Sequence, residues 1–218
     1  MKSNKILQLI VILLCVLGSF EVKAAAISDD EAIAWADDKA NLLLSTFAEK
    51  DVMLRYQNLD KLFLEYVDLD YVGKFVSGKY WKTMSAEQQK RYLGVFKRYA
   101  LSTYKGFPLS FAAKVKYKIN GVSHIGDNTN VVAELDLGEE VNGIKNLLLE
   151  IRMHRKNNKI QIVDIKVAES SLILSYRNRF YEMFARNDGD VDWFIEDLEE
   201  ITSSAEQNNQ ERLDNLQY

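Results

Sequence analysis

The segment from Lys159 to Phe184 constrains the fold more than any other part of the chain, because a strand pattern in it passes directly into a helical one. Residues 160–167 are apolar and rich in β-branched side chains, which is typical of a β-strand. A strand that leads straight into an amphipathic helix predicts a sheet with helices packed beside it. The apolar side chains of the helical part recur at helical spacing: Leu172, Ile173, Tyr176, Phe180, Met183 and Phe184.

Three further strands are predicted upstream of this segment. Residues 114–119 alternate lysines with apolar side chains, so that one face is charged and the other apolar. Residues 131–137 and 147–153 also alternate. Asn142-Gly143 and Asn157-Asn158 are typical tight-turn dipeptides, and Asn120-Gly121 also favours a turn. The sequence therefore predicts a four-stranded antiparallel sheet.

The first half of the chain is predicted to be helical. Ser28–Glu31 and Ser85–Gln88 are capping boxes, which indicate where two helices begin. The second of these helices is expected to reach about Tyr104. Shorter helices are expected over 60–66 and 69–77. Together with the sheet, they predict an α+β domain with helices packed on one face of the sheet.

The N-terminus resembles a cleaved export signal. Lys2 and Lys5 precede an apolar stretch from Ile6 to Phe20, and small residues follow at 24–26. We predict a signal peptide over residues 1–26, with cleavage after Ala24 as the second choice. An uncleaved membrane anchor is the alternative, because about 15 apolar residues approach the length that can span a bilayer.

Cleavage after residue 26 removes the only cysteine, Cys15, so the remaining chain forms no disulfide. Three of the 28 basic and one of the 32 acidic residues lie in 1–26, so the rest carries a net charge of −6. This balance disfavours nucleic acid as a partner. We expect one domain over 27–202, with a short helix after Asp188-Gly189-Asp190, and a flexible polar tail over 203–218.

The polar residues form no recognisable catalytic pattern. The two histidines, His124 and His154, are expected at the solvated surface. Asp68 and Asp70 lack further ligands at a metal-binding spacing, so helix capping is the favoured interpretation. The sequence also contains no nucleophile elbow, phosphate-binding glycine loop or dinucleotide fingerprint. We therefore predict no catalytic residue, no metal and no cofactor.

Several short segments occur in an order and spacing that carry a family resemblance. They are Asp70–Trp81, Ser85–Gln89, Phe96 and Tyr104 in the first half, and Val163–Ile165, Ser171-Leu172, Tyr176-Arg177 and Phe180 in the second. Over residues 30–201 the chain resembles the MlaC-type proteins, which are periplasmic phospholipid-binding components of the Mla ABC transport system (toluene-tolerance auxiliary proteins). Two residues depart from the family pattern: Ile160 stands where tryptophan is common, and Glu169 replaces a usual glycine.

The resemblance implies a fold and a function together. It implies an α+β domain whose sheet and helices enclose the acyl chains of a phospholipid. It also implies a periplasmic shuttle between an outer-membrane lipoprotein complex and an inner-membrane transporter with an MCE-domain subunit. The family has no catalytic residues to transfer.

The lining of the expected apolar cavity follows from our own assignment of apolar faces. It comprises Val72, Phe75, Val76, Phe96, Tyr99, Tyr104, Val115, Tyr117, Val131, Leu135, Leu149, Leu172, Tyr176 and Phe180. Arg177 is a candidate for the headgroup phosphate, with a structural ion pair or a partner contact as the alternative. An aromatic stripe at helical spacing is also typical of an ordinary core. Two other functions therefore stay open, a carrier of another apolar lipid such as a hopanoid, and an envelope adaptor without a cavity.

Overall fold

The computed structural model describes residues 26–105, 114–141 and 143–215. The predicted signal peptide, apart from Ala26, and the Gly106–Pro108 junction lie outside these residues. Among the described residues no helix is both long and apolar enough to cross a membrane. The helices are α2 (Asp29–Phe47), α3 (Val52–Tyr66), α4 (Leu69–Ser77), the 3-10 helix η1 (Gly78–Lys82), α5 (Ala86–Lys105), α6 (Leu172–Arg186) and α7 (Val191–Asn215). The strands are β1 (Lys116–Ile125), β2 (Asn128–Val141), β3 (Ile144–Lys156), β4 (Lys159–Val167) and β5 (Ser170–Ser171).

The predicted antiparallel meander is confirmed, but the sheet has five strands instead of four. The strands follow one another in the order β1-β2-β3-β4-β5, and each pairs antiparallel with the next. The fifth is only two residues long and carries no hydrophobic pattern of its own. Asn157 and Asn158 both have positive φ in the β3–β4 turn, as the turn prediction requires. The turn predicted at Asn120-Gly121 is wrong, because β1 continues through it with a shift in register.

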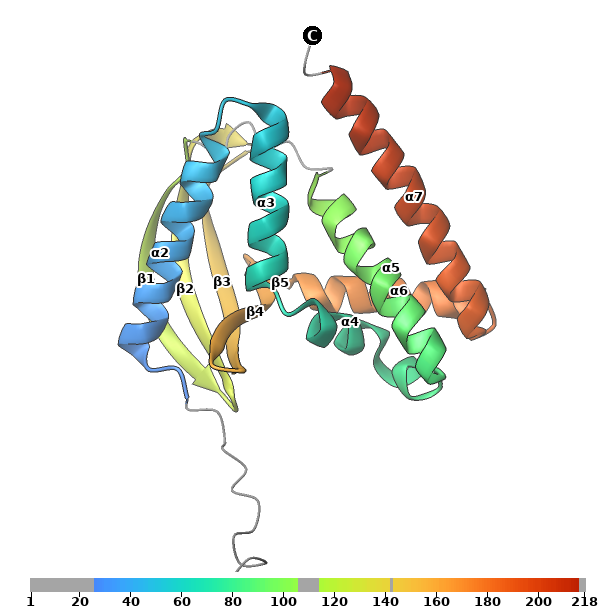
Figure 1. The fold of residues 1–218 in the computed structure, drawn as a ribbon. Coiled ribbons are helices and arrows are strands. Elements are labelled where there is room, and N and C mark those ends of the chain that lie inside the picture. Colours follow the sequence, from blue (N-terminus) through green and yellow to red (C-terminus); the bar gives the residue numbers. More distant parts are fainter. Residues whose placement is uncertain (1–25, 106–113, 142, 216–218) are drawn as a thin grey trace, which may run out of the picture.

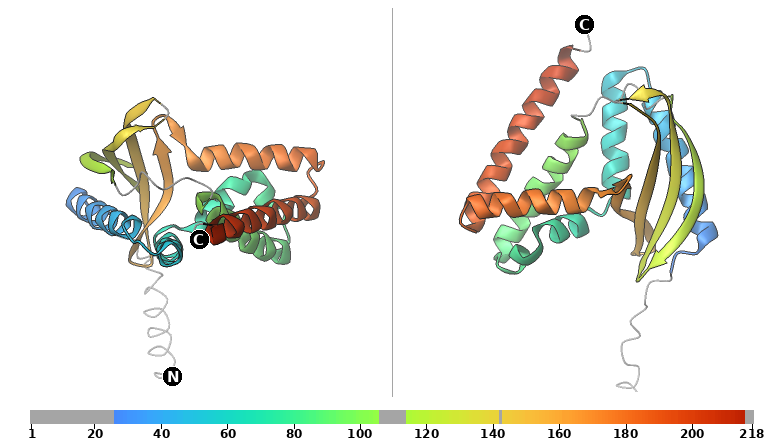
Figure 2. Two further views of the ribbon diagram at one scale, coloured as in Figure 1. Left: turned by 90° about the horizontal axis from the view of Figure 1, so that it is seen from above. Right: turned by 180° about the vertical axis from the view of Figure 1, so that it is seen from behind.

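The helices occupy two places relative to the sheet (Figures 1 and 2). Helices α2 and α3 lie along one face, where Ala32 and Ala36 of α2 pack against Val131, Met153 and Ile160. Helices α4 to α7 gather beyond the edge formed by β4. The predicted helix layer on one face is therefore correct for α2 and α3 only.

The helices beyond the sheet have their own aromatic core. Phe96 of α5, Phe180 and Phe184 of α6 and Phe194 of α7 are almost completely buried against one another. Their rings meet at centroid distances between 3.6 and 6.1 Å. The aromatic stripes seen in the sequence thus serve largely to join helices to one another.

Helix α7 corrects the prediction of a flexible tail from residue 203. It continues to Asn215, and its polar second half is fixed to α5 by buried or paired groups. The Asn209 side chain donates to the Ser102 carbonyl oxygen at 2.8 Å. Arg98 donates to both carboxylate oxygens of Glu206, at 3.0 and 2.6 Å. Polar composition alone suggested disorder, whereas these contacts order the segment.

Candidate apolar binding site

An apolar cavity of about 160 Å³ lies where β4 meets four helices. Because each element contributes only a few side chains, the cavity exists only in the assembled fold. Helix α3 and the residue after it contribute Phe63 and Val67, and α4 contributes Leu69 and Val72. The remaining lining residues are Phe96, Ala100 and Tyr104 from α5, Ile162, Val163, Asp164 and Ile165 from β4, and Leu172, Ile173 and Tyr176 from α6.

A β-bulge in β4 shapes the sheet side of this cavity. Arg152 of β3 is opposite Asp164, while the next residue, Met153, is opposite Ile162, so Val163 is an extra residue in β4. The bulge locally breaks the alternation of side chains along the strand. As a result four consecutive β4 residues, 162 to 165, border the cavity.

Asp164 supplies the only carboxylate among the described residues of the lining, and it serves as a helix cap. Its Oδ2 accepts a hydrogen bond from the Ser171 hydroxyl at 2.7 Å, and its Oδ1 accepts from the Ile173 backbone N–H at 3.2 Å. Ser171 in turn caps α6 by accepting from the Leu174 N–H at 3.2 Å. These bonds fix the start of α6 to β4, so that Leu172 and Tyr176 face the cavity.

Helix α3 is held against α5 at the opposite wall. The Tyr104 hydroxyl donates to Asp60, and Lys105 Nζ donates to the other oxygen of the same carboxylate at 2.7 Å. The rings of Phe63 and Tyr104 stack with centroids 5.4 Å apart. Burial, together with the Asp60 carboxylate, raises the pKa of Tyr104, so its hydroxyl remains a donor. We call the two bonds from Tyr104 and Lys105 to the Asp60 carboxylate the Asp60 clasp.

Asp68 holds the junction between α3 and α4 to the β3–β4 hairpin. Its carboxylate accepts from the Tyr71 backbone N–H at 3.1 Å, from His154 Nε2 at 3.0 Å and from Lys156 Nζ at 2.8 Å. Burial would raise the pKa of Asp68, but the hydrogen bonds from Lys156 and Tyr71 outweigh it and lower the pKa. The capping role predicted for Asp68 is confirmed. His154 is largely buried in this contact, so its predicted place at the solvated surface is wrong.

The cavity brings together five of the fifteen residues predicted to bind lipid: Val72, Phe96, Tyr104, Leu172 and Tyr176. The other ten do not line it. Phe75, Val76, Tyr99 and Phe180 belong to the aromatic core between the helices, and Val131 lies under α2. Tyr117 donates to the Asp37 carboxylate at 2.7 Å. Leu135 and Leu149 are half-buried on the sheet, and Val115 is half-buried just before β1.

Arg177 also lies away from this lining. Its guanidinium donates to the Tyr181 hydroxyl at 3.1 Å and lies over the Phe75 ring, 5.1 Å from the centroid. Burial would raise the pKa of Tyr181, but the Lys79 backbone N–H and Arg177 together lower it. The structure thus gives Arg177 aromatic partners on α4 and α6.

Sequence reasoning missed nine of the fourteen lining residues that the described part of the chain contributes. Phe63 and Val67 lie at the end of α3, whose position against the sheet edge no periodicity reveals. The β4 residues lie at the bulge, where the alternation that guides face assignment fails. The family resemblance nevertheless includes the segment Val163–Ile165, which was the one sequence signal that pointed to these β4 residues.

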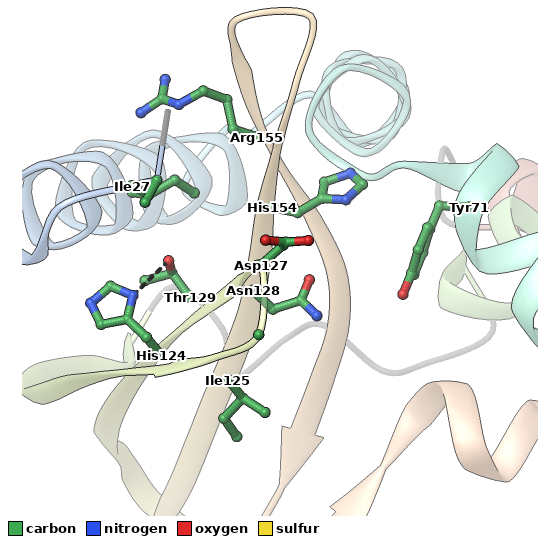
Figure 3. A pocket seen from close by; sticks show the side chains of 11 residues that line it. Ile27, Tyr71, His124, Ile125, Asp127, Asn128, Thr129, His154 and Arg155 are labelled. Atoms are coloured by element: carbon green, nitrogen blue, oxygen red, sulfur yellow. Dashed lines mark hydrogen bonds between the residues drawn. The ribbon is translucent and has the colours of Figure 1, made fainter. Parts of the chain in front are cut away.

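A second, larger and more polar pocket of about 820 Å³ lies at the far end of the sheet (Figure 3). Its side chains come from the β1–β2 turn, the β3–β4 hairpin, α4 and the residues before α2. His124 is bound to Thr129 at 3.1 Å and to Asp29 at 2.7 Å, and His154 is engaged by Asp68. Within the described ranges no group of three or more histidine, cysteine or acidic side chains is placed to hold a metal. The polar lining makes this pocket a poor shelter for hydrocarbon.

Comparison with known proteins places the chain in a family. The family model described as MlaC protein matches residues 39–200, about three quarters of the chain. The chain belongs to the MlaC family. The intermembrane phospholipid transport system binding protein MlaC of Haemophilus influenzae is 27% identical over 155 residues, covering 68% of this chain and 71% of that protein. A phospholipid-binding protein from Ralstonia solanacearum, solved in complex with a phospholipid, has a TM-score of 0.63 and 18% identity, and covers 82% of this chain and 99% of its own. This structural likeness supports the α+β fold inferred from the sequence.

Proposed function

We propose that this protein binds a phospholipid by its acyl chains in the cavity between β4 and helices α3 to α6. The observation that carries the proposal is an apolar cavity at the junction of sheet and helices in a member of the MlaC family. The names of two similar proteins support phospholipid as the ligand. One is the binding protein of an intermembrane phospholipid transport system, and the other is a phospholipid-binding protein.

The physical need for such a carrier is large. Exposing acyl chains to water costs about 0.8 kcal/mol per CH₂. A two-chain lipid with about 30 such groups would therefore cost roughly 24 kcal/mol to release into water. A dry cavity replaces the bilayer interior and lets the lipid move between membranes with little net change in free energy.

The cavity must widen to accept this cargo. Pockets for drug-sized ligands measure about 300–1,000 Å³, whereas this cavity holds about 160 Å³. Helix α3 is held against α5 chiefly by the Asp60 clasp and the Phe63–Tyr104 stack, which are few contacts for a wall of this cavity. We propose that α3 moves away from α5 as the acyl chains enter.

The transport route is the finer part of the proposal. We propose that the protein works in the periplasm after removal of residues 1–26. There it carries lipid between an outer-membrane lipoprotein complex and an inner-membrane transporter with an MCE-domain subunit, and so maintains outer-membrane asymmetry. Deleting its gene in a double-membraned bacterium should expose phospholipid in the outer leaflet. An outer leaflet unchanged by the deletion would argue against this route.

Native mass spectrometry of protein purified gently from a bacterial host tests the binding step. The expected spectrum contains a one-to-one adduct with the mass of a phospholipid. An adduct of hopanoid mass would assign a different apolar cargo to the same cavity. Protein that carries no lipid and takes none from vesicles would contradict the proposal and favour an envelope adaptor.

A further inference from the structure

One buried polar group near the cavity has no hydrogen-bond partner. Tyr99 of α5 is only 3% exposed, and within the described part of the chain nothing hydrogen-bonds to its hydroxyl. The Thr103 hydroxyl lies near the hydroxyls of both Tyr99 and Tyr176 and acts to lower the pKa of each, but it donates its proton to the Tyr99 backbone carbonyl oxygen at 2.8 Å. A buried hydroxyl without a partner lowers the stability of the lipid-free fold. It therefore calls for a ligand or a functional reason.

Tyr99 lies one side chain away from the cavity. Its ring meets the ring of Tyr176 edge-on, with centroids 5.8 Å apart, and Tyr176 lines the cavity. Ala100, the next residue of α5, lines the cavity as well. The Tyr99–Tyr176 contact thus forms a seam between α5 and α6 at the cavity wall.

A cation completes this seam on its exposed side. The Arg179 guanidinium lies over the Tyr99 ring, 5.8 Å from its centroid, and makes no ion pair with any described carboxylate. Burial raises the pKa of both Tyr99 and Tyr176, and the charge of Arg179 opposes that rise at each of them. The two phenols and the guanidinium therefore share one electrostatic environment.

We propose that Tyr99, Tyr176 and Arg179 form the polar subsite for the ester and phosphate oxygens of a bound glycerophospholipid. This inference rests on the proposed function, and it adds an orientation for the cargo. The phenol hydroxyls donate to ester carbonyl oxygens, and the guanidinium binds the phosphate, for which its planar set of donors is well suited. The acyl chains then run from the α5–α6 seam toward Val67 and Ile162.

The decisive variant is Tyr99→Phe, because it removes the unpartnered hydroxyl and nothing else. The melting temperature of the lipid-free protein should stay the same or rise, since no hydrogen bond is lost. Binding of phospholipid from phosphatidylethanolamine–phosphatidylglycerol vesicles should weaken about five- to ten-fold, which is typical for loss of one hydrogen bond. Unchanged phospholipid affinity in Tyr99→Phe would overturn the subsite.

Tyr92→Phe is the matched control on the same helix. Tyr92 is also buried, but its hydroxyl donates to the Gly73 carbonyl oxygen at 2.8 Å. Its loss should lower the melting temperature of the lipid-free protein and leave the lipid affinity of the folded protein unchanged. Equal loss of affinity in both variants would mean a general effect on packing and would also count against the subsite.

Arg179→Gln separates phosphate from ester recognition. Phospholipid binding should weaken about ten-fold, as expected for a charge-assisted hydrogen bond, while binding of diacylglycerol should not change. An equal effect on both ligands, or displacement of lipid by inorganic phosphate alone, would overturn the assignment to the lipid headgroup. Wild-type protein that binds no lipid would refute the proposed function itself. Lipid binding equal in wild type and Tyr99→Phe would refute only the subsite.

Discussion

Filling the cavity should stabilise the protein and at the same time stop lipid uptake. Ala100 of α5 lines the cavity and is 6% exposed, so a larger side chain at this position points into free space. Leucine adds three carbons, worth about 2.4 kcal/mol at roughly 0.8 kcal/mol per buried group. An empty cavity of 160 Å³ lowers the stability of the folded protein by up to about 4 kcal/mol at roughly 24 cal/mol per Å³. Filling part of it can therefore supply the stabilisation expected from the added carbons.

We expect Ala100→Leu to stabilise the lipid-free protein by about 1–2 kcal/mol, after a deduction for imperfect fit. For a chain of this size that raises the melting temperature by about 2–8 °C. The same carbons exclude part of an acyl chain, so lipid affinity should fall about 10- to 50-fold. Thermal unfolding followed by circular dichroism and transfer of labelled lipid from vesicles measure the two effects.

Ala36→Leu is the control for this prediction. Ala36 is also a buried alanine in a helix, but it lies on the face of α2 that packs directly against the sheet, away from the cavity. The larger side chain should destabilise the protein there by about 1–3 kcal/mol without changing the lipid affinity of folded molecules. If Ala100→Leu also lowers the melting temperature, the space is already filled. If it raises stability yet leaves lipid uptake intact, the cargo binds elsewhere.

Three further predictions concern the contacts that frame the site. Asp68 has a lowered pKa in the folded protein, so its contribution to stability is present above about pH 4 and is lost as the pH falls below that value. Asp68→Asn should therefore flatten the pH dependence of the free energy of urea unfolding between about pH 5 and 3. An unaltered pH dependence would disprove this linkage. Ser171→Ala removes the cap of α6 and should cost about 1 kcal/mol in urea unfolding, whereas the exposed Ser123→Ala should cost almost nothing. Truncation after Thr202 removes the buried Leu213 and the Asn209–Ser102 bond and should lower stability by about 2–4 kcal/mol; a truncated protein as stable as the full chain would restore the prediction of a loose tail.

Local sequence signals predicted individual elements well. Ser85 and Gln88 form a reciprocal capping box, with each backbone N–H donating to the other side chain at 3.2 and 2.9 Å. The predicted end of α4 at Gly78 and the break between α6 and α7 are also confirmed. Such features depend on interactions between residues close in sequence, so they can be predicted without a structure.

The relative placement of elements was not predictable in the same way. Periodicity identifies an apolar face but does not say which neighbour covers it, so Phe180 and Val131 were assigned to a cavity that neither of them lines. The second half of α7 was missed for a related reason. Its order depends on Arg98 and Ser102, which lie about 100 residues earlier on α5.

Helix α7 also has a consequence for how the chain folds. Leu213, near the end of the chain, packs against Tyr56 and Leu59 of α3. Because Leu213 follows Leu59 by about 150 residues in the sequence, this contact cannot form until the whole segment between them has been synthesised. Loop closure over such a separation is slow, so assembly of the helical half should be rate-limiting and should leave its aromatic surfaces open to chaperones meanwhile.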